Sequence, residues 1–165
     1  MFAWRACHNI LPNYEKLRRR RIIEDDTCTI CHQFPETAIH ALWECGATQD
    51  VWAGCPNRIL QKGLTNQGDV LQLIANLMHK LTKEDLELFL VQCWLIWNQR
   101  NLILHGGNMQ EPSRLNARAS SFLAEYKGAQ TQLAVSKTKD HSQLWQPPEG
   151  TMYKLNFDTT VFADM

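Results

Sequence analysis

The sequence lacks an apolar run long enough to cross a membrane, which takes about 18 or more consecutive apolar residues. Its longest apolar stretch, 86–97, ends at the polar residues 98–101 and is better explained as a core helix. A secretory leader is also missing, because Arg5, His8 and Asn9 interrupt the first apolar residues. We therefore expect a nuclear or cytoplasmic protein that is not secreted, has no membrane partner and keeps its thiols reduced.

Motifs of several catalytic classes are missing as well. The chain has no glycine-rich phosphate loop, no nucleophile turn of the Gly-x-Ser-x-Gly kind and no His-Glu-x-x-His helix. We therefore find no sequence support for nucleotide hydrolysis, serine hydrolase chemistry or a metalloprotease.

Net charge is absent too, since 17 basic residues balance 17 acidic ones, so the total charge indicates no partner. The distribution of charge is more informative, because Glu15 is the only acid within residues 1–21. The basic residues of that range are Arg5, Lys16, Arg18, Arg19, Arg20 and Arg21. This run could be a solvated helix face, a nuclear-import signal or a phosphate-binding patch. Under the third interpretation, the nucleic-acid contacts are Lys16 and Arg18 to Arg21.

What the chain does have is a compact set of metal-binding residue types. Cys28, Cys31, His40 and Cys45 have the spacing Cys-x2-Cys-x8-His-x4-Cys. A Cys-x-x-Cys turn can direct two thiolates at one ion, and a second element can bring back the histidine and the last cysteine. Four protein ligands leave no open position for water, so we predict a structural zinc site that does not catalyse.

Other uses of these residues fit less well. A disulfide framework requires an oxidising compartment, and a thioredoxin-like pair requires a surrounding βαβ pattern that the sequence does not show. An iron–sulfur centre usually takes four thiolates, so the histidine favours zinc. A chance grouping of free side chains remains the alternative. Cys7 and Cys55 are interpreted as buried apolar residues outside the ligand set.

The first third of the chain predicts short helices around the metal segment. Residues 2–11 have apolar positions at helical spacing up to Pro12, and Asn13 can cap a second helix that carries the basic run. A helix starting near Pro35 would place His40 on one face and end near Gly46. We expect Val51 and Trp52 to be core residues.

The central part predicts longer helices and a mainly α fold. Asp69 begins one helix, and Thr82 with Asp85 forms a capping-box pair ahead of a second, 86–104, which we expect to be the centre of the core. Gly106 follows its end. Pro112 opens a third helix with an apolar stripe of Leu115, Ala119, Phe122, Tyr126 and Leu133.

The end of the chain changes character. Residues 136–144 are polar and predict a linker, whereas 152–158 alternate with a period of two and predict a single β-strand. A lone strand has no stability without a sheet to join. The predicted organisation is a zinc-binding domain at 1–55, a helical region at 56–135, the linker at 136–144 and the truncated start of another domain at 145–165.

The zinc segment resembles the zinc-binding domain that follows reverse transcriptase in plant non-LTR retrotransposons. The resemblance covers about the first third of the chain and rests on Phe2-x-Trp4-Arg5-Ala6, Leu11-Pro12, Leu17, Arg20 or Arg21, Cys28-x-x-Cys31, Glu36-Thr37-Ala38-x-His40, Cys45 and Val51-Trp52. A second motif resembles the helix found downstream in such polyproteins, Trp94-x-x-Trp97-x-x-Arg100-Asn101. The resemblance implies retroelement RNA or its DNA target as the partner.

The C-terminal residues resemble the opening of a ribonuclease H domain. The motif is Trp145-x-Pro147-Pro148-x-Gly150-x-x-x-Lys154-Leu155-Asn156-x-Asp158. By this resemblance Asp158 is the first of several carboxylates that hold two metal ions about 4 Å apart. The other carboxylates would lie beyond Met165, and Thr159-Thr160 departs from the small residues usual there. Asp158 is thus a remnant, and we expect a fragment of a retroelement polyprotein that is not an enzyme.

Two functions follow from the sequence. The first is a non-catalytic zinc module that binds RNA or DNA through phosphates, without regard to base sequence. The alternative is a protein-interaction module in which zinc only staples a helical lobe to a tryptophan-rich core. Phosphate binding weakens steeply as salt rises, whereas an apolar interface does not.

Overall fold

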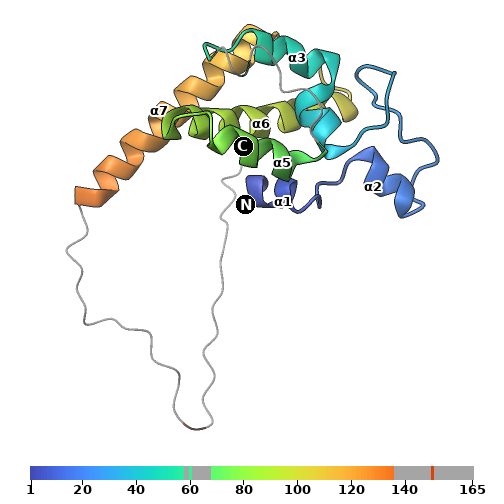
Figure 1. Cartoon of the computed structure of the whole chain (residues 1–165), viewed down its shortest axis with the longest axis horizontal. Helices are drawn as coiled ribbons and strands as arrows, with labels where there is room; N and C mark the ends of the chain where they lie inside the picture. Colours follow the sequence, from blue (N-terminus) through green and yellow to red (C-terminus); the bar gives the residue numbers. More distant parts are fainter. Residues whose placement is uncertain (58–59, 61–67, 136–149, 151–165) are drawn as a thin grey trace, which may run out of the picture.

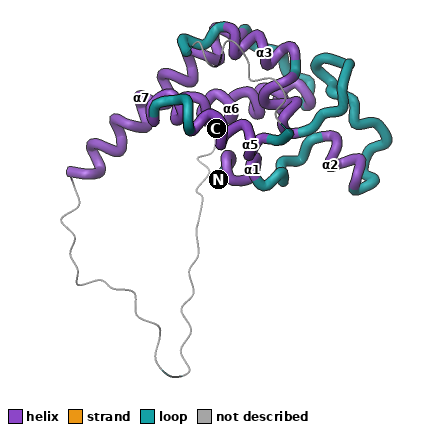
Figure 2. The backbone as a smooth tube through the Cα atoms, in the orientation of Figure 1, coloured by secondary structure: helices purple, strands orange, loops and turns teal. Residues whose placement is uncertain are grey.

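The fold is mainly α-helical, as the sequence predicted (Figure 1). The computed structural model describes residues 1–57, 60, 68–135 and 150. Its helices, in chain order, are α1 (Phe2–Cys7), α2 (Tyr14–Arg19), the π-helical η1 (His40–Glu44), α3 (Gly46–Ala53), α5 (Val70–Met78), α6 (Lys83–Leu104) and α7 (Pro112–Val135). Within the described ranges the only β pairing is an isolated bridge between Thr27 and Pro35, and Figure 2 shows no strand there. The predicted linker 136–144 and strand 152–158 lie outside the described residues.

Helix α6 is the centre of the fold. Thr82 caps it, because its hydroxyl oxygen accepts from the Asp85 amide at 3.2 Å while the hydroxyl donates to the Asp85 carboxylate at 3.0 Å. The helix ends at Leu104, and Gly106 follows with a φ of +81°, a conformation that glycine adopts without steric cost. Helices α1, α5, α7 and η1 all pack against α6. This arrangement confirms the capping pair and the central position predicted for this helix.

The metal segment and the later helices share one apolar core. The rings of Trp43 and Trp52 lie 5.2 Å apart, and Trp52 stacks on Phe89 of α6 at the same centroid distance. The Trp52 indole N–H donates to the Leu42 carbonyl at 3.0 Å, so this buried ring leaves no unpaired donor. Described residues of the predicted domain 1–55 therefore pack in one core with described residues of the predicted helical region 56–135.

Several helix boundaries differ from the prediction. Helix α1 ends at Cys7, well before Pro12, whereas Asn13 does cap α2, its side chain accepting from the Lys16 amide at 2.9 Å. The helix that carries His40 begins only after Thr37, whose hydroxyl oxygen accepts from the His40 amide at 3.0 Å. That helix ends at Glu44, close to Gly46 as predicted, and Gly46 itself begins α3. A side chain that reaches an orphan helix amide sets the boundary more closely than apolar spacing does.

The apolar stripe predicted for α7 is only partly buried. Leu115 and Ala119 lie in the core, but Phe122 and Tyr126 are 43% and 53% exposed. Helix α7 continues past the end of the helices that it packs on (Figure 1), so its later turns have no facing element among the described residues.

Candidate metal centre and basic surface

The four predicted metal ligands converge on one point. The sulfur atoms of Cys28, Cys31 and Cys45 and a ring nitrogen of His40 all lie within 4.8 Å of one another. The Cys31 sulfur is 3.3 Å from His40 Nε2. A tetrahedral zinc ion with bonds of about 2.0 to 2.3 Å sets its ligand atoms roughly 3.3 to 3.8 Å apart. The donor set therefore fits zinc, and the distance between Cys31 Sγ and His40 Nε2 is that of one edge of such a tetrahedron.

A tight loop presents the first two ligands. The Cys28 amide donates to the Phe34 carbonyl, and the His32 amide donates to the Cys28 carbonyl, both at 2.8 Å. The Thr27–Pro35 bridge closes the same loop at its base. His32 has a φ of +53°, which is the left-handed turn that reverses the chain. These bonds satisfy the backbone of the loop while both sulfurs face inward.

The π-helical geometry of η1 explains how His40 and Cys45 can share a metal. In an α-helix, residues five apart are rotated by about 140° and face different sides. Here the Cys45 amide donates to the His40 carbonyl at 2.8 Å, which is the i to i+5 bond of a π-helix. The wider turn brings Cys45 back over His40. The sequence predicted both ligands but not this geometry.

The protonation of the ligands is coupled. A hydrogen bond with the Cys45 thiol lowers the pKa of Cys28 to about 3, and the same bond raises the pKa of Cys45. Burial opposes a charge on His40, but its hydrogen bonds with Cys28 and Cys31 raise its pKa above the usual value. Zinc takes thiolates and a neutral imidazole, so zinc binding releases protons from this cluster.

The remaining cysteines lie outside the metal site. Cys55 is buried beside α6 and α7, where the Gln92 amide donates to its sulfur at 3.0 Å. Gln92 also donates to Asn116 Oδ1, and Asn116 in turn donates to the Val51 carbonyl, both at 3.0 Å. Cys93 is buried on α6, and Cys7 lies at the end of α1. The structure places neither Cys7 nor Cys55 in the ligand cluster, as predicted, and Cys55 is buried, but Cys7 is only partly buried, contrary to the prediction.

Glu36 and Arg100 tie the metal loop to α6, and the sequence analysis assigned them no role of their own. Glu36 stands between Cys31 and His40 in the sequence and is fully buried. Its carboxylate accepts from the Arg100 guanidinium. The only available signal was the presence of both residues in the motifs that carry the family resemblance. Residue spacing could not have shown that they meet.

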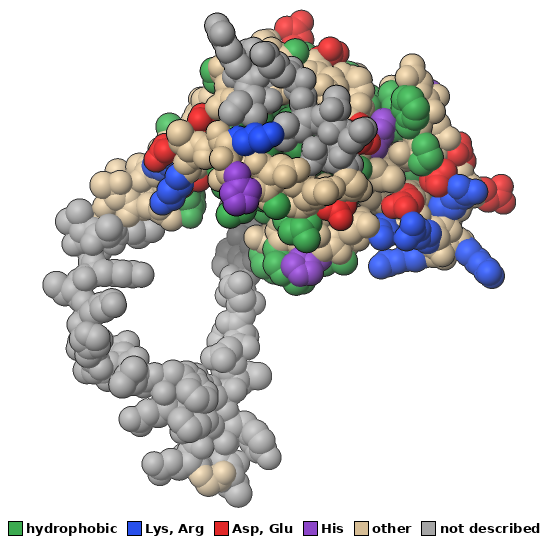
Figure 3. Space-filling view, in the orientation of Figure 1, with side chains coloured by type: hydrophobic (Ala, Val, Ile, Leu, Met, Phe, Trp, Pro, Cys, Tyr) green, Lys and Arg blue, Asp and Glu red, His purple; other side chains and the backbone are tan. Residues whose placement is uncertain are grey.

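The basic run is divided by the fold into paired and unpaired side chains. Arg18 donates to Asp26 at 2.9 Å and Arg19 donates to Glu15 at 2.6 Å. Lys16 and Arg20, in contrast, line a groove together with Arg5 of α1. Arg21 is exposed and has a φ of +57°. Figure 3 shows a group of blue cationic side chains at one end of the molecule, with red acidic ones among them, and further blue side chains elsewhere on the same face.

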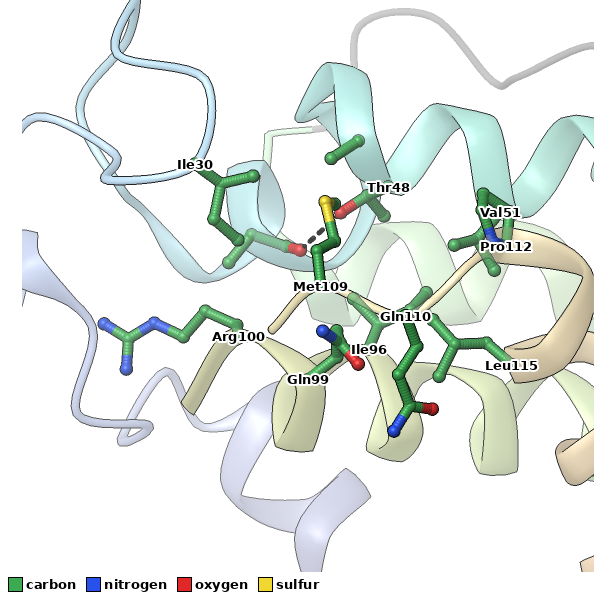
Figure 4. A pocket seen from close by; sticks show the side chains of 12 residues that line it. Ile30, Thr48, Val51, Ile96, Gln99, Arg100, Met109, Gln110, Pro112 and Leu115 are labelled. Carbon is green, nitrogen blue, oxygen red and sulfur yellow. Dashed lines mark hydrogen bonds between the residues drawn. The ribbon is translucent and has the colours of Figure 1, made fainter. Parts of the chain in front are cut away.

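A small internal cavity marks the junction between the metal loop and the helices. It has a volume of about 20 Å³ and is lined by Ile30 of the loop together with residues of α3, α6 and the start of α7 (Figure 4). In this view Arg100 points away from the other labelled side chains, and the Thr48 hydroxyl donates to the Ala41 carbonyl at 2.9 Å. A space of this size holds about one water molecule, so it is a packing gap and not a substrate pocket.

The ligand geometry agrees with the comparison to known families. Residues 1–52 match the family described as zinc-binding in reverse transcriptase. This range includes all four ligands, and the metal bound there is zinc. No curated protein and no solved structure matches the chain. Among the helices of the described residues, none has the length and apolar character to cross a membrane.

Proposed function

We propose that this chain is a non-catalytic zinc module that binds nucleic acid through its phosphates. The observation that carries the proposal is a surface of cations held against the zinc site. The Glu15 amide donates to the Glu36 carbonyl at 3.2 Å, and the Tyr14 amide donates to the Glu36 carboxylate at 3.1 Å. The start of helix α2 is thus tied to the metal loop, which sets where its basic side chains leave the backbone.

Zinc supplies structure in this mechanism. With four protein ligands the ion has no open position for water, so it organises the loop and leaves binding to the side chains. The loop holds Asp26 against Arg18 and Glu36 against α2. The family that matches residues 1–52 is described as zinc-binding in reverse transcriptase, an enzyme that acts on nucleic acid. This match supports nucleic-acid binding as the function of the chain. The wider proposal is that the chain is a fragment of a plant non-LTR retrotransposon polyprotein.

Salt dependence tests the proposal directly. Fluorescence anisotropy would follow a labelled single strand of roughly 12 nucleotides as salt rises from roughly 50 to 200 mM, and we expect log affinity to fall with a slope of about −0.7 per phosphate contact. Protein treated with a chelator is the control, and its binding should be weaker because α2 is released from the loop. Salt-independent binding, or none by the zinc-loaded protein, would contradict the proposal.

A second candidate is a protein-interaction module, which an open apolar groove favours. The groove has a volume of about 510 Å³ and lies between the start of the chain, α6 and α7, with Trp94, Phe122 and Tyr126 in its wall. The rings of Trp94 and Phe122 lie 5.2 Å apart, and Phe122 is still 43% exposed. If nucleic acid does not bind and Phe122→Ser abolishes capture of a protein partner, this candidate replaces the first.

A further inference from the structure

The groove between α1 and α2 has an unusual lining. It has a volume of about 460 Å³, within the range of roughly 300 to 1,000 Å³ that is typical of ligand sites. Arg5 comes from α1, whereas Lys16 and Arg20 come from α2 and the residue that follows it. The rest of the lining is apolar or uncharged, and no acidic side chain is part of it. Three cations thus face one space with no carboxylate among them.

These three cations differ from the neighbouring arginines in that they form no ion pairs with other described residues. Arg18 and Arg19 already have acidic partners, Asp26 and Glu15. Within the part of the chain that the structure describes, no ion pair involves Arg5, Lys16 or Arg20. Positions 16 and 20 are one helical turn apart and therefore share a face of α2. Like charges held this close repel one another, and an anion in the groove would remove the repulsion.

An exposed aromatic residue directly precedes one of the groove's cations in the sequence. Trp4 is 54% exposed, although a tryptophan ring usually gains from burial. Its ring lies 4.4 Å from that of His8, whose Nδ1 is 2.9 Å from the Trp4 carbonyl. Trp4 directly precedes Arg5 on α1, and successive helix positions are rotated by about 100°. The ring therefore lies on a neighbouring face of α1 and is not part of the groove lining, although its backbone adjoins that of Arg5.

We propose that the groove binds a single-stranded nucleic acid, with phosphates at Arg5, Lys16 and Arg20 and a base stacked on Trp4. This inference rests on the proposed function and specifies its site and its substrate. Proteins that bind single strands combine a cationic groove with aromatic platforms, because every base offers a face for stacking. A duplex keeps its bases stacked inside and offers none to Trp4. RNA and DNA share this chemistry, so the test compares an RNA probe with a DNA probe, which lacks the 2′-hydroxyl.

Two triple variants with equal charge loss test the phosphate contacts. The groove variant carries Arg5→Gln, Lys16→Gln and Arg20→Gln, and the control carries Arg18→Gln, Arg19→Gln and Arg21→Gln. The probes are labelled oligo-uridine and oligo-thymidine. We expect the slope of log affinity against log salt concentration to become shallower by about 2 in the groove variant and by less than 1 in the control. A further variant, Arg5→Lys with Arg20→Lys, keeps the charge and should retain the slope of the unmodified chain.

Trp4 variants test the stacking contact. Trp4→Ala should weaken single-strand binding roughly 5- to 150-fold, while Trp4→Phe keeps a ring and should lose less. Binding of a duplex of the same length should not change in either variant. Zinc content and helical circular dichroism of each variant confirm that it has folded.

The outcomes separate this inference from the proposed function. The groove proposal would be wrong if the control triple weakened salt-dependent binding as much as the groove triple, or if Trp4→Ala left that binding unchanged. The proposed function, nucleic-acid binding through phosphates, would stand in either case. A duplex that binds more tightly than a single strand would also overturn the groove. If the unmodified protein binds neither probe, both proposals are wrong.

Discussion

The Arg100 guanidinium donates to the Glu36 carboxylate across 64 positions of sequence, and both side chains are buried. Arg100 also lies over the rings of Trp97 and Tyr14, at 4.8 and 5.3 Å from their centroids. The carboxylate accepts from the Tyr14 amide as well, at 3.1 Å. A buried ion pair is tolerated when further hydrogen bonds satisfy both partners, as they do here. The pair joins the zinc loop, α2 and α6 at a single point.

Removing one partner of this pair should destabilise the fold strongly. We expect Glu36→Ala to lower the free energy of unfolding by about 3 to 5 kcal/mol, because it leaves the Arg100 charge buried and unpaired. Denaturant unfolding followed by circular dichroism measures the change. Glu44→Ala is the control, since Glu44 is exposed and forms no ion pair with another described residue, and surface changes usually stay within about 0.5 kcal/mol.

A double variant measures the interaction between Glu36 and Arg100 separately from the effect of removing each side chain. Glu36→Leu with Arg100→Met should lose less stability than the sum of the two single changes, because neither charge is then left alone. Additive losses would show that the two side chains do not interact.

Zinc should bind with one equivalent per chain. Elemental analysis should find that Cys31→Ser and His40→Ala abolish binding, while Cys7→Ser, the control outside the cluster, leaves it intact. Structural zinc contributes on the order of 10 kcal/mol to organising its segment. Because Trp52 stacks on Phe89, chelation should also loosen the packing against α6, which near-ultraviolet circular dichroism would detect. Stoichiometric zinc in the His40→Ala protein would contradict the ligand set.

We expect the Asn116 side chain on α7 to contribute to the free energy of unfolding, because it bridges α3 and α6. Asn116→Ala removes one hydrogen bond from the Val51 carbonyl, which keeps the Gly54 amide, and one from the Gln92 amide, which keeps the Cys55 sulfur. Each lost bond costs about 0.5 to 1.5 kcal/mol. Arg118→Ala on an exposed position of the same helix is the matched control. Equal unfolding free energies for the two variants would show that water replaces the Asn116 contacts.

Asp158→Asn should change neither stability nor nucleic-acid binding. A two-metal site needs several carboxylates converging from different elements, and a single one binds Mg²⁺ weakly because this ion keeps its waters. The residue lies outside the described part of the structure, so the prediction rests on sequence alone. Magnesium-dependent cleavage of an RNA–DNA hybrid that this substitution abolishes would contradict the prediction.

The sequence was most informative where the deciding contacts are local. The zinc ligands follow from their spacing, and the caps at Asn13, Asp69 and Thr82 each involve a side chain that reaches an amide three residues ahead. These interactions depend on a few neighbouring residues, so a pattern of residue types is enough to predict them. The helical character of the fold follows in the same way from the period of its apolar residues.

Tertiary structure decided which residues of a given type have partners. Met78 shares the apolar period of α5 with Leu77, yet it is 61% exposed because no described element covers its side of the helix. Arg18 and Arg20 are equivalent in sequence, but only Arg18 meets an acid, and only Arg20 faces the groove of Arg5. Such pairings depend on how distant segments dock. Docking is set by the shape of the whole core, and no local pattern of residues encodes that shape.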